Sequence, residues 1–302
     1  MQVMELIEIN CPVCSSDKCT IMYPDSLGAN PPLFGYKWVP DVRKMYRVVR
    51  CKSCGHVYCS PRLKDMYKYY TDVSDDVYLA NERQRVKTSE LVIPIIQRFC
   101  PSGKLLDVGC STGDFVHTAA KHFNAEGLEL SQWASQIARN KGVNLHTKSL
   151  SEMNEKDGLY DVVTMWGVIE HLENPKDEIL HVNRLLRQNG VLCFWTGNVD
   201  SLFSKILRQR WPYMLGQHIQ FFSKKSLDRL MRDCGFERAY MGIYPYTISF
   251  DYFADILNRY FIIGNITRFF VNLLALKERD FVIKKPDEMF AIYRKTMDHR
   301  PT

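Results

Sequence analysis

The pattern of apolar and polar positions changes near residue 104, where short apolar runs begin to alternate with amphipathic segments. The apolar runs predict strands over residues 104–108, 125–130, 161–168, 191–196, 236–243 and 288–295. Between them, helical spacing predicts helices over residues 114–123, 131–141, 175–188 and 223–233. Strands that alternate with helices form a largely parallel sheet covered on both faces. The pattern therefore predicts a doubly wound α/β fold.

Three segments fall outside this alternation. Residues 1–60 hold six of the ten cysteines and several prolines, which predicts a small module of short strands and loops with little apolar core. Residues 61–100 are expected to be a helical linker, most helical over 78–99 and kinked or broken at Pro94. Residues 101–302 would form the main domain, in which residues 244–287 are a helical insertion before the last strand.

The insertion carries a wide apolar face. Over residues 251–277, polar side chains such as Asp251, Asp255 and Arg268 recur at near-helical spacing between phenylalanines, isoleucines and leucines. We expect this face to pack on protein, as a lid or as the surface of a homodimer. Association with a membrane surface is the less favoured alternative.

Composition narrows the class of protein. The 302-residue chain is 46% hydrophobic and 25% charged, as in ordinary globular proteins, and its net charge of +6 requires no acidic partner. The opening segment MQVMELIEIN lacks the basic start of a signal peptide, and no apolar run reaches the roughly 18 residues of a membrane span. Ten cysteines without a secretion signal favour a reducing compartment. We therefore expect a cytoplasmic protein.

A glycine-containing turn follows the first predicted strand. Residues 105–115, L-L-D-V-G-C-S-T-G-D-F, run from that strand through Gly109 and Gly113 into a helix. Glycine lets the backbone turn sharply and approach a ligand, and the helix N-terminus favours an anionic group. Glu129 ends the next strand, where an acidic side chain can hydrogen-bond ribose hydroxyls. The arrangement predicts a site for a nucleoside-containing cofactor.

Three other interpretations fit the turn less well. A dinucleotide fingerprint would need glycine where Ser111 and Asp114 stand. The letters G-x-S-x-G also match the nucleophile elbow of hydrolases, but such an elbow normally follows several strands, and this strand is the first. A purely structural turn would leave Glu129 and the later motifs without an explanation.

Four motifs resemble those of class I S-adenosylmethionine-dependent methyltransferases. They are D-V-G-C-S-T-G at 107–113, Glu129, Y-D-V-V at 160–163 and V-I-E-H-L at 168–172, the last followed by Pro175. The resemblance covers residues 100–243 and 288–295, and it is strongest to the subgroup with an E-H-L motif. The family usually has glycine where Ser111 stands. The resemblance implies a Rossmann-like fold and S-adenosylmethionine as the cofactor.

The resemblance also assigns residues to the cofactor. Glu129 would hold the ribose, and Trp166 and Gly167 would border the methionine moiety. Residues 148–150 would face the adenine, although the acidic residue often found there is absent. The full set of expected cofactor residues is Asp107, Gly109, Cys110, Ser111, Gly113, Phe115, Glu129, Leu130, Ser149, Leu150, Trp166 and Gly167.

Methyl transfer needs an acceptor held in line with the sulfonium and a group that removes its proton. His171 and His218 are the candidate bases, and Glu170 completes the candidate catalytic set. Resembling enzymes often have a histidine where His218 stands, so His218 is favoured, whereas a packing role for His171 is equally reasonable. Some relatives bind a divalent cation through E-x-x-E-H, but Gly167 replaces the first glutamate, so no catalytic metal is expected. An N/D-P-P-Y motif, used to methylate nucleobase amines, is also absent.

Two C-x-x-C pairs lie near the N-terminus, Cys11 with Cys14 and Cys51 with Cys54. Four thiolates from two such pairs form the closed tetrahedral set of a structural zinc ion. A thioredoxin-like redox motif would instead be single and would lie beside a βαβ unit. The sequence therefore predicts zinc, with His56 as an outside candidate ligand.

These observations favour a small-molecule methyltransferase with a zinc module that stabilises the fold or gates the substrate. The resemblance is closest to enzymes that methylate sugars in bacterial polysaccharide or natural-product pathways, and oxygen is the favoured acceptor atom. Basic residues near the module, among them Arg43, Arg47 and Arg50, keep an RNA methyltransferase as the second hypothesis. The third is an inactive scaffold that binds a protein partner.

Overall fold

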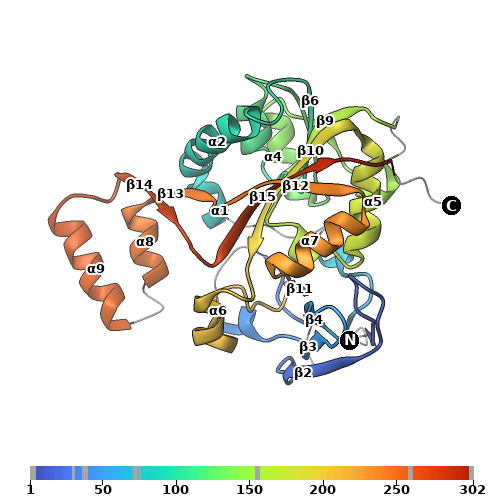
Figure 1. Cartoon of the computed structure of the whole chain (residues 1–302). Helices are drawn as coiled ribbons and strands as arrows, with labels where there is room; N and C mark the ends of the chain where they lie inside the picture. Colours follow the sequence, from blue (N-terminus) through green and yellow to red (C-terminus); the bar gives the residue numbers. More distant parts are fainter. Residues whose placement is uncertain are drawn as a thin grey trace.

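The computed structural model describes residues 5–28, 31–35, 40–70, 74, 76–153, 157–257 and 261–298 (Figure 1). A seven-stranded sheet with the order β12-β15-β10-β9-β6-β7-β8 forms its centre. The strands are β6 Lys104–Val108, β7 Asn124–Leu128, β8 Asn144–His146, β9 Tyr160–Trp166, β10 Leu186–Gly197, β12 Phe236–Gly242 and β15 Glu288–Lys295. Strands β8, β7, β6, β9 and β10 pair in parallel, and β15 runs antiparallel to both β10 and β12.

Helices pack on both faces of this sheet because neighbouring strand residues point in opposite directions. Leu105 and Val162 pack with α2 and α3, whereas Leu106 and Val163 pack with α5 and α7. The helices are α1 Asp76–Ala80, α2 Glu82–Gln97, α3 Asp114–Ala119, α4 Gln132–Asn140, α5 Pro175–Leu185 and α7 Lys224–Asp233. The predicted doubly wound, Rossmann-like fold is confirmed.

Several predicted boundaries differ from the observed ones. The strands β6 and β15 begin and end where the pattern predicts, but α3 ends at Ala119, four residues early. The short strand β8 was not predicted. The helix α2 runs through Pro94, where a break or kink was expected. The proline cannot donate a backbone hydrogen bond, and burial of Val92, Ile93 and Ile96 in the core compensates for the free energy that this loss costs.

The cysteine-rich segment forms a small sheet with the order β11-β4-β3-β2. Its strands are β2 Cys19–Tyr23, β3 Val48–Cys51, β4 Val57–Cys59 and β11 Gln220–Phe221. The last strand comes from the main domain, so residues 1–60 do not complete their own sheet. The strand β1 Leu6–Ile7 pairs with β5 Arg62–Leu63 in the predicted linker.

The two parts also share a core. Tyr46 and Val57 pack in one buried cluster with Trp211, Ile219 and Phe221 of the main domain. The segment expected to have little apolar core of its own thus buries its apolar side chains against residues 211–221. The fold of this segment and the path of residues 211–221 therefore depend on each other.

The insertion is a helical hairpin carried on a two-stranded ribbon. The ribbon pairs β13 Pro245–Ser249 with β14 Asp280–Lys284, and the helices are α8 Phe250–Leu257 and α9 Phe261–Leu273. Figure 1 shows the helices projecting to one side of the sheet. The exposed apolar residues at the hairpin are Ile266, Phe269, Phe270, Leu273 and Leu274. Within one chain this face does not pack on protein, so the homodimer remains a prediction.

Among the described residues, no helix is both long and apolar enough to cross a membrane.

Candidate active site

The turn after β6 has the backbone conformation that its glycines suggest. Gly109 and Gly113 have φ angles of 71° and 78°, and Ser111 between them has a φ of 48°. A Cβ atom on Gly109 would lie 2.7 Å from Val168 Cγ2, so the position also needs glycine for space. The tight turn brings the backbone of Gly109 and Ser111 to the edge of a cavity at the carboxyl ends of the parallel strands.

This cavity has a volume of about 630 Å³. The expected cofactor residues that line it are Asp107, Gly109, Cys110, Ser111, Phe115, Glu129, Leu130, Ser149, Leu150, Trp166 and Gly167. Gly113 does not line it. A Cβ at Gly113 would lie 2.8 Å from Val143 Cγ2 and 3.0 Å from Ala138 Cβ, so this glycine allows α4 to approach the turn.

Two buried carboxyl groups face the cofactor half of the cavity. Glu129 accepts hydrogen bonds from the backbone N–H groups of Ser111 (2.8 Å) and Ser131 (2.7 Å), while burial raises its pKa. Asp107 accepts a 2.6 Å hydrogen bond from Thr164 Oγ1, and burial raises its pKa to about 8. Both side chains are held rigidly, and both could accept hydrogen bonds from hydroxyl or amine groups of a ligand.

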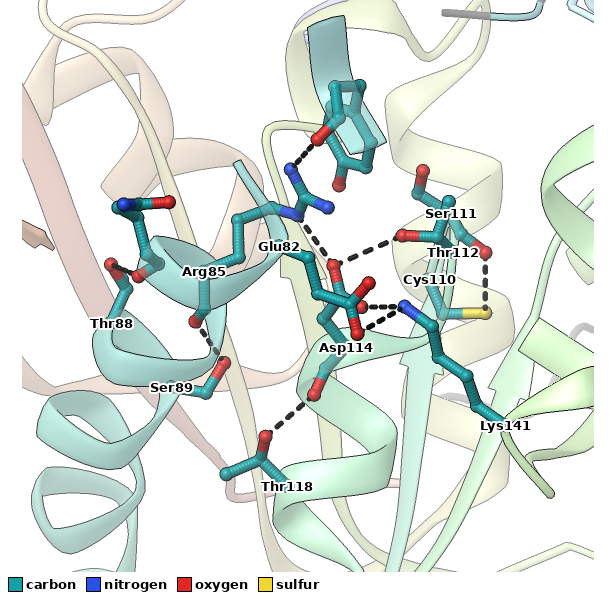
Figure 2. A network of polar contacts seen from close by, with 12 residues as sticks. Glu82, Arg85, Thr88, Ser89, Cys110, Ser111, Thr112, Asp114, Thr118 and Lys141 are labelled. Atoms are coloured by element: carbon teal, nitrogen blue, oxygen red, sulfur yellow. Dashed lines mark hydrogen bonds and ion pairs between the residues drawn. The ribbon is translucent and has the colours of Figure 1, made fainter. Parts of the chain in front are cut away.

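The helix α2 contributes an arginine that the sequence analysis missed. Arg85 Nε donates a 2.6 Å hydrogen bond to Asp114 Oδ2, and Lys141 pairs with the other oxygen of the same carboxylate (Figure 2). Arg85 also lines the cavity, and its buried Nη2 has no hydrogen-bond partner among the described residues. An unpaired guanidinium nitrogen beside a helix N-terminus is suited to an anionic ligand. No local pattern marks Arg85, because it lies on a helix predicted only as a linker.

The candidate catalytic residues lie at the other half of the cavity. The rings of His171 and His218 meet edge to face, with centroids 4.7 Å apart. His218 Nδ1 lies 2.7 Å from the Tyr213 carbonyl, which can only accept, so Nδ1 carries the proton and Nε2 is free to accept one. Burial lowers the pKa of His218 to about 4 and that of His171 well below its usual value. Both imidazoles are therefore neutral near pH 7.

Glu170 lies beneath the histidine pair. It is buried and accepts a 3.1 Å hydrogen bond from Thr196 Oγ1, and burial raises its pKa to about 8. Glu170, His171 and His218 offer ligand atoms within 4.8 Å of one another, which is a spacing that could hold a metal ion. The expectation of no catalytic metal, which rests on Gly167 in place of the first glutamate, stays a prediction.

Residues 80–239, more than half of the chain, match a family described as a methyltransferase domain. The chain belongs to this family. The prediction of an S-adenosylmethionine-dependent methyltransferase is supported by this match and by the fold.

Among curated proteins, the methyltransferase resembles enzymes named ubiquinone biosynthesis O-methyltransferase. The protein from Rickettsia conorii is 33% identical over 120 residues, which are 37% of this chain and 38% of that protein. The one from Methylococcus capsulatus is 26% identical over 195 residues, 57% of this chain and 82% of that protein. The chain thus spans less than half the length of the first of these relatives.

Solved structures share the fold of the methyltransferase at low sequence identity. A Thermotoga maritima protein described as a SAM-dependent methyltransferase has a TM-score of 0.50 and 18% identity over 74% of this chain and 94% of that chain. A chain from a complex of the Haloferax volcanii Trm112 methyltransferase activator has a TM-score of 0.52 and 12% identity, covering 78% of this chain and all of that one.

Segments outside the family match also line the cavity of the methyltransferase. Gly35 and Val42 from the cysteine-rich segment and Tyr67 and Tyr70 from the linker line it. The hydroxyl of Tyr70 lies 2.7 Å from His171 Nδ1. The residues that line the cavity from the ribbon and its flanks are Tyr244, Tyr246, Thr247, Ile248, Lys285 and Glu288. Aromatic residues in such segments are usually core residues, so no sequence pattern marks them as lining a cavity.

The four expected zinc ligands lie together beside the methyltransferase domain. Cys11, Cys14, Cys51 and Cys54 offer sulfur atoms within 4.8 Å of one another. Cys11 and Cys54 sulfurs are 3.5 Å apart, and Cys14 and Cys51 sulfurs are 3.6 Å apart. Zinc–sulfur bonds of 2.3 Å in a tetrahedron require edges of about 3.8 Å, so the cluster fits a zinc ion. His56, the outside candidate, instead contacts Gln220 and Ser226.

Proposed function

We propose that this protein transfers the methyl group of S-adenosylmethionine to a hydroxyl oxygen of a small-molecule acceptor. The observation that carries the proposal is that the turn after β6 and the pair His171–His218 line one and the same cavity. The turn provides the cofactor contacts, and the histidines provide neutral nitrogen acceptors for a proton. The names of the curated relatives support oxygen as the acceptor atom.

Residues around the turn would hold the cofactor. Glu129 is proposed to bind the ribose hydroxyls, and Ser149 and Leu150 to border the adenine. Trp166 would border the sulfonium, whose positive charge is attracted to an aromatic face. Arg85 would pair through its unpartnered Nη2 with the carboxylate of the methionine moiety. When bound, the cofactor supplies an electrophilic methyl group.

The histidine pair would handle the acceptor proton. Because the Tyr213 carbonyl holds the proton of His218 on Nδ1, Nε2 can accept the proton that the attacking hydroxyl loses. The low pKa keeps this nitrogen unprotonated throughout the neutral range. His171 is proposed to orient the acceptor beside the cofactor. Enclosure of the cavity by aromatic side chains excludes water from the reaction.

The acceptor is proposed to be small rather than a nucleic acid. Two of the basic residues expected to attract RNA pair with acidic groups: Arg47 with Glu8 at 2.6 Å, and Arg50 with Asp200 at 3.8 Å. Paired cations release fewer counterions on binding phosphate, which disfavours RNA binding. The sugar class of acceptor rests only on the sequence resemblance, and it remains a proposal beside the ubiquinone-pathway names of the relatives.

We propose further that Cys11, Cys14, Cys51 and Cys54 bind one structural zinc ion. Their sulfur spacing supports this set, and four thiolate ligands leave no open position for catalysis. The metal would hold together the two C-x-x-C turns, at residues 11–14 and 51–54, beside the small sheet. Because that sheet includes β11, the zinc ion would also support the segment that carries His218.

One experiment tests the proposed reaction. The purified protein is incubated with S-adenosylmethionine bearing a labelled methyl group and a panel of hydroxylated small molecules, with and without RNA. We expect S-adenosylhomocysteine to raise the melting temperature and the label to appear as an O-methyl ether of a small molecule. The proposal would be refuted if neither S-adenosyl compound binds. If only RNA is methylated, the acceptor is RNA and not a small molecule.

A further inference from the structure

The acceptor half of the cavity ends in a group of polar side chains that no motif explains. Glu288 begins β15, Tyr246 lies on β13, and Tyr213 lies in the segment that leads to β11. Because β15 runs antiparallel to β10, its first residue lies opposite Gly197, at the carboxyl ends of the parallel strands. All three residues line the same cavity as His171 and His218.

The polar atoms of this group are enclosed and incompletely paired. Glu288 Oε2 and the hydroxyl oxygens of Tyr213 and Tyr246 have no hydrogen-bond partner of ordinary geometry among the described residues. They still form one cluster, because weak hydrogen bonds to Glu288 and its charge add to burial in raising the pKa of both phenols. Lys285 Nζ lies 3.1 Å from Glu288 Oε1 and 4.2 Å from the centre of the Tyr246 ring.

It is unusual for three buried polar atoms of one cluster to lack a hydrogen bond of ordinary geometry. Buried polar atoms in proteins nearly always have partners, and an unpaired one destabilises the fold. Such atoms are expected where a ligand completes the hydrogen bonds. The cluster lies close to the candidate base, since the ring centroids of Tyr213 and His218 are 5.6 Å apart.

We propose that Glu288, Tyr213 and Tyr246 form a subsite that recognises a second hydroxyl group of the acceptor, next to the one that is methylated. This inference rests on the proposed O-methyltransferase function. A hydroxyl both donates and accepts, so it can pair with the carboxyl oxygen and a phenol together. A phosphate or carboxylate would meet the carboxyl group of Glu288 and is disfavoured.

The surrounding rings suggest the shape of the acceptor. Trp195 and Tyr244 flank Tyr246, with ring centroids 5.5 Å and 4.8 Å from it, and both line the cavity. Flat apolar walls suit a ring, either the face of a sugar or an arene, and both can carry neighbouring hydroxyls. The subsite would thus select ring compounds with two adjacent hydroxyl groups and would position them toward His218.

A stability measurement tests the subsite without any ligand. Removing a hydroxyl that is reserved for a ligand should leave stability unchanged or raise it, because no protein hydrogen bond of ordinary geometry is lost. We expect Tyr213→Phe and Tyr246→Phe to keep or raise the melting temperature. The matched control is Tyr293→Phe on β15, whose buried hydroxyl donates a 2.7 Å hydrogen bond to Asp228 and whose loss should lower it. An equal loss in all three variants would mean that the two hydroxyls are structural and would overturn the proposal.

A binding measurement tests the ligand class. Protein saturated with S-adenosylhomocysteine is titrated with methyl α-glucopyranoside and, separately, with catechol, which distinguishes the two sources of adjacent hydroxyls. We expect one of the two probes to bind the wild-type protein. The double variant Tyr213→Phe, Tyr246→Phe should bind that probe at least tenfold more weakly. Its affinity for S-adenosylhomocysteine should be unchanged. Binding of neither probe to the wild type, or equal binding to the variant, would overturn the subsite. Failure of S-adenosylhomocysteine to bind the wild type would instead count against the proposed function.

Discussion

His56 Nε2 and Gln220 Oε1 lie 2.9 Å apart, and this contact joins the cysteine-rich segment to the methyltransferase domain. Gln220 also donates a 3.0 Å hydrogen bond to the carbonyl of Leu172, the last residue of the E-H-L motif. One amide side chain therefore links the small sheet, the strand β11 and the loop that carries His171. Changes in the small sheet should consequently reach the acceptor side of the cavity.

The first prediction concerns this link. His56→Ala leaves Gln220 Oε1 buried without its partner, so we expect the free energy of unfolding to fall by about 1–3 kcal/mol. Urea denaturation measures the change. His122→Ala, at an exposed position, is the control and should have little effect. Equal stability of the two variants would show that the contact contributes nothing.

The second prediction concerns the metal. Elemental analysis of the purified protein should find one zinc ion per chain, and Cys14→Ser should lose it because three thiolates bind zinc much more weakly than four. Cys19→Ser is the matched control, since Cys19 lies outside the four-sulfur group, and it should keep the zinc. Full zinc occupancy in a Cys14→Ser, Cys51→Ser double variant would refute the assignment.

The third prediction concerns Arg85. If its Nη2 pairs with the methionine carboxylate, Arg85→Ala should weaken S-adenosylhomocysteine binding at least about tenfold, as expected for the loss of a charge-assisted hydrogen bond. Titration calorimetry gives the affinity. Methylthioadenosine, which lacks the carboxylate, should bind wild type and variant alike, which separates loss of the contact from distortion of Asp114. Arg83→Ala, a neighbouring exposed arginine, should change neither affinity.

The sequence predicted the parts of this molecule that depend on local pattern. Apolar runs located β6 and β15 to the residue, and the predicted glycine turn lines the cavity. The strand β8 was missed because three residues carry no recognisable run. The pairing of β11 with β4 joins residues more than 160 positions apart, and two residues give no periodicity.

The acceptor-side residues other than the predicted His171, His218 and Glu170 were missed for the same physical reason. Glu288 is the first residue of a correctly predicted strand, but only the antiparallel direction of β15 brings it to the cavity. Arg85 lies on a segment that was predicted to be helical, but the direction of its side chain depends on where the helix docks. Non-local packing decides both, and a single sequence does not encode it in any short-range pattern.

The fourth prediction concerns pH. In the folded protein the pKa of Glu170 is about 8, whereas a glutamate in an unfolded chain has the ordinary value of 4.5. As the pH rises, the unfolded chain therefore loses this proton before the folded protein does. The free energy of unfolding should therefore fall between pH 6.5 and 8, by at most about 1.4 kcal/mol per pH unit for one proton. Glu170→Gln cannot ionise and should show a shallower fall in denaturation curves. Glu237→Gln, at an exposed position, should keep the wild-type slope, and the same slope in all three proteins would contradict the buried protonated carboxyl.

The last prediction separates the roles of the two histidines. A base that accepts the hydroxyl proton contributes about 10²–10⁴-fold to the rate, so His218→Ala should lower turnover by that factor with nearly unchanged S-adenosylhomocysteine affinity. His218→Asn sharpens the test, because its amide can still donate to the Tyr213 carbonyl but offers nothing at the position of Nε2. It should fold normally and be as slow as His218→Ala.

His171→Ala should instead lower the cofactor affinity more than His218→Ala does. His171 lies in the short turn after β9, and the end of β9 carries Trp166, followed by Gly167. Turnover and cofactor titration are measured on all variants with the acceptor found in the methylation assay. If His218→Asn keeps wild-type turnover while His171→Ala abolishes it with unchanged cofactor affinity, the two roles are reversed. If neither substitution slows the reaction, neither His171 nor His218 removes the proton of the acceptor hydroxyl. Positioning of the acceptor against the sulfonium would then supply the rate enhancement, because a hydroxyl that attacks a cationic centre loses its proton late.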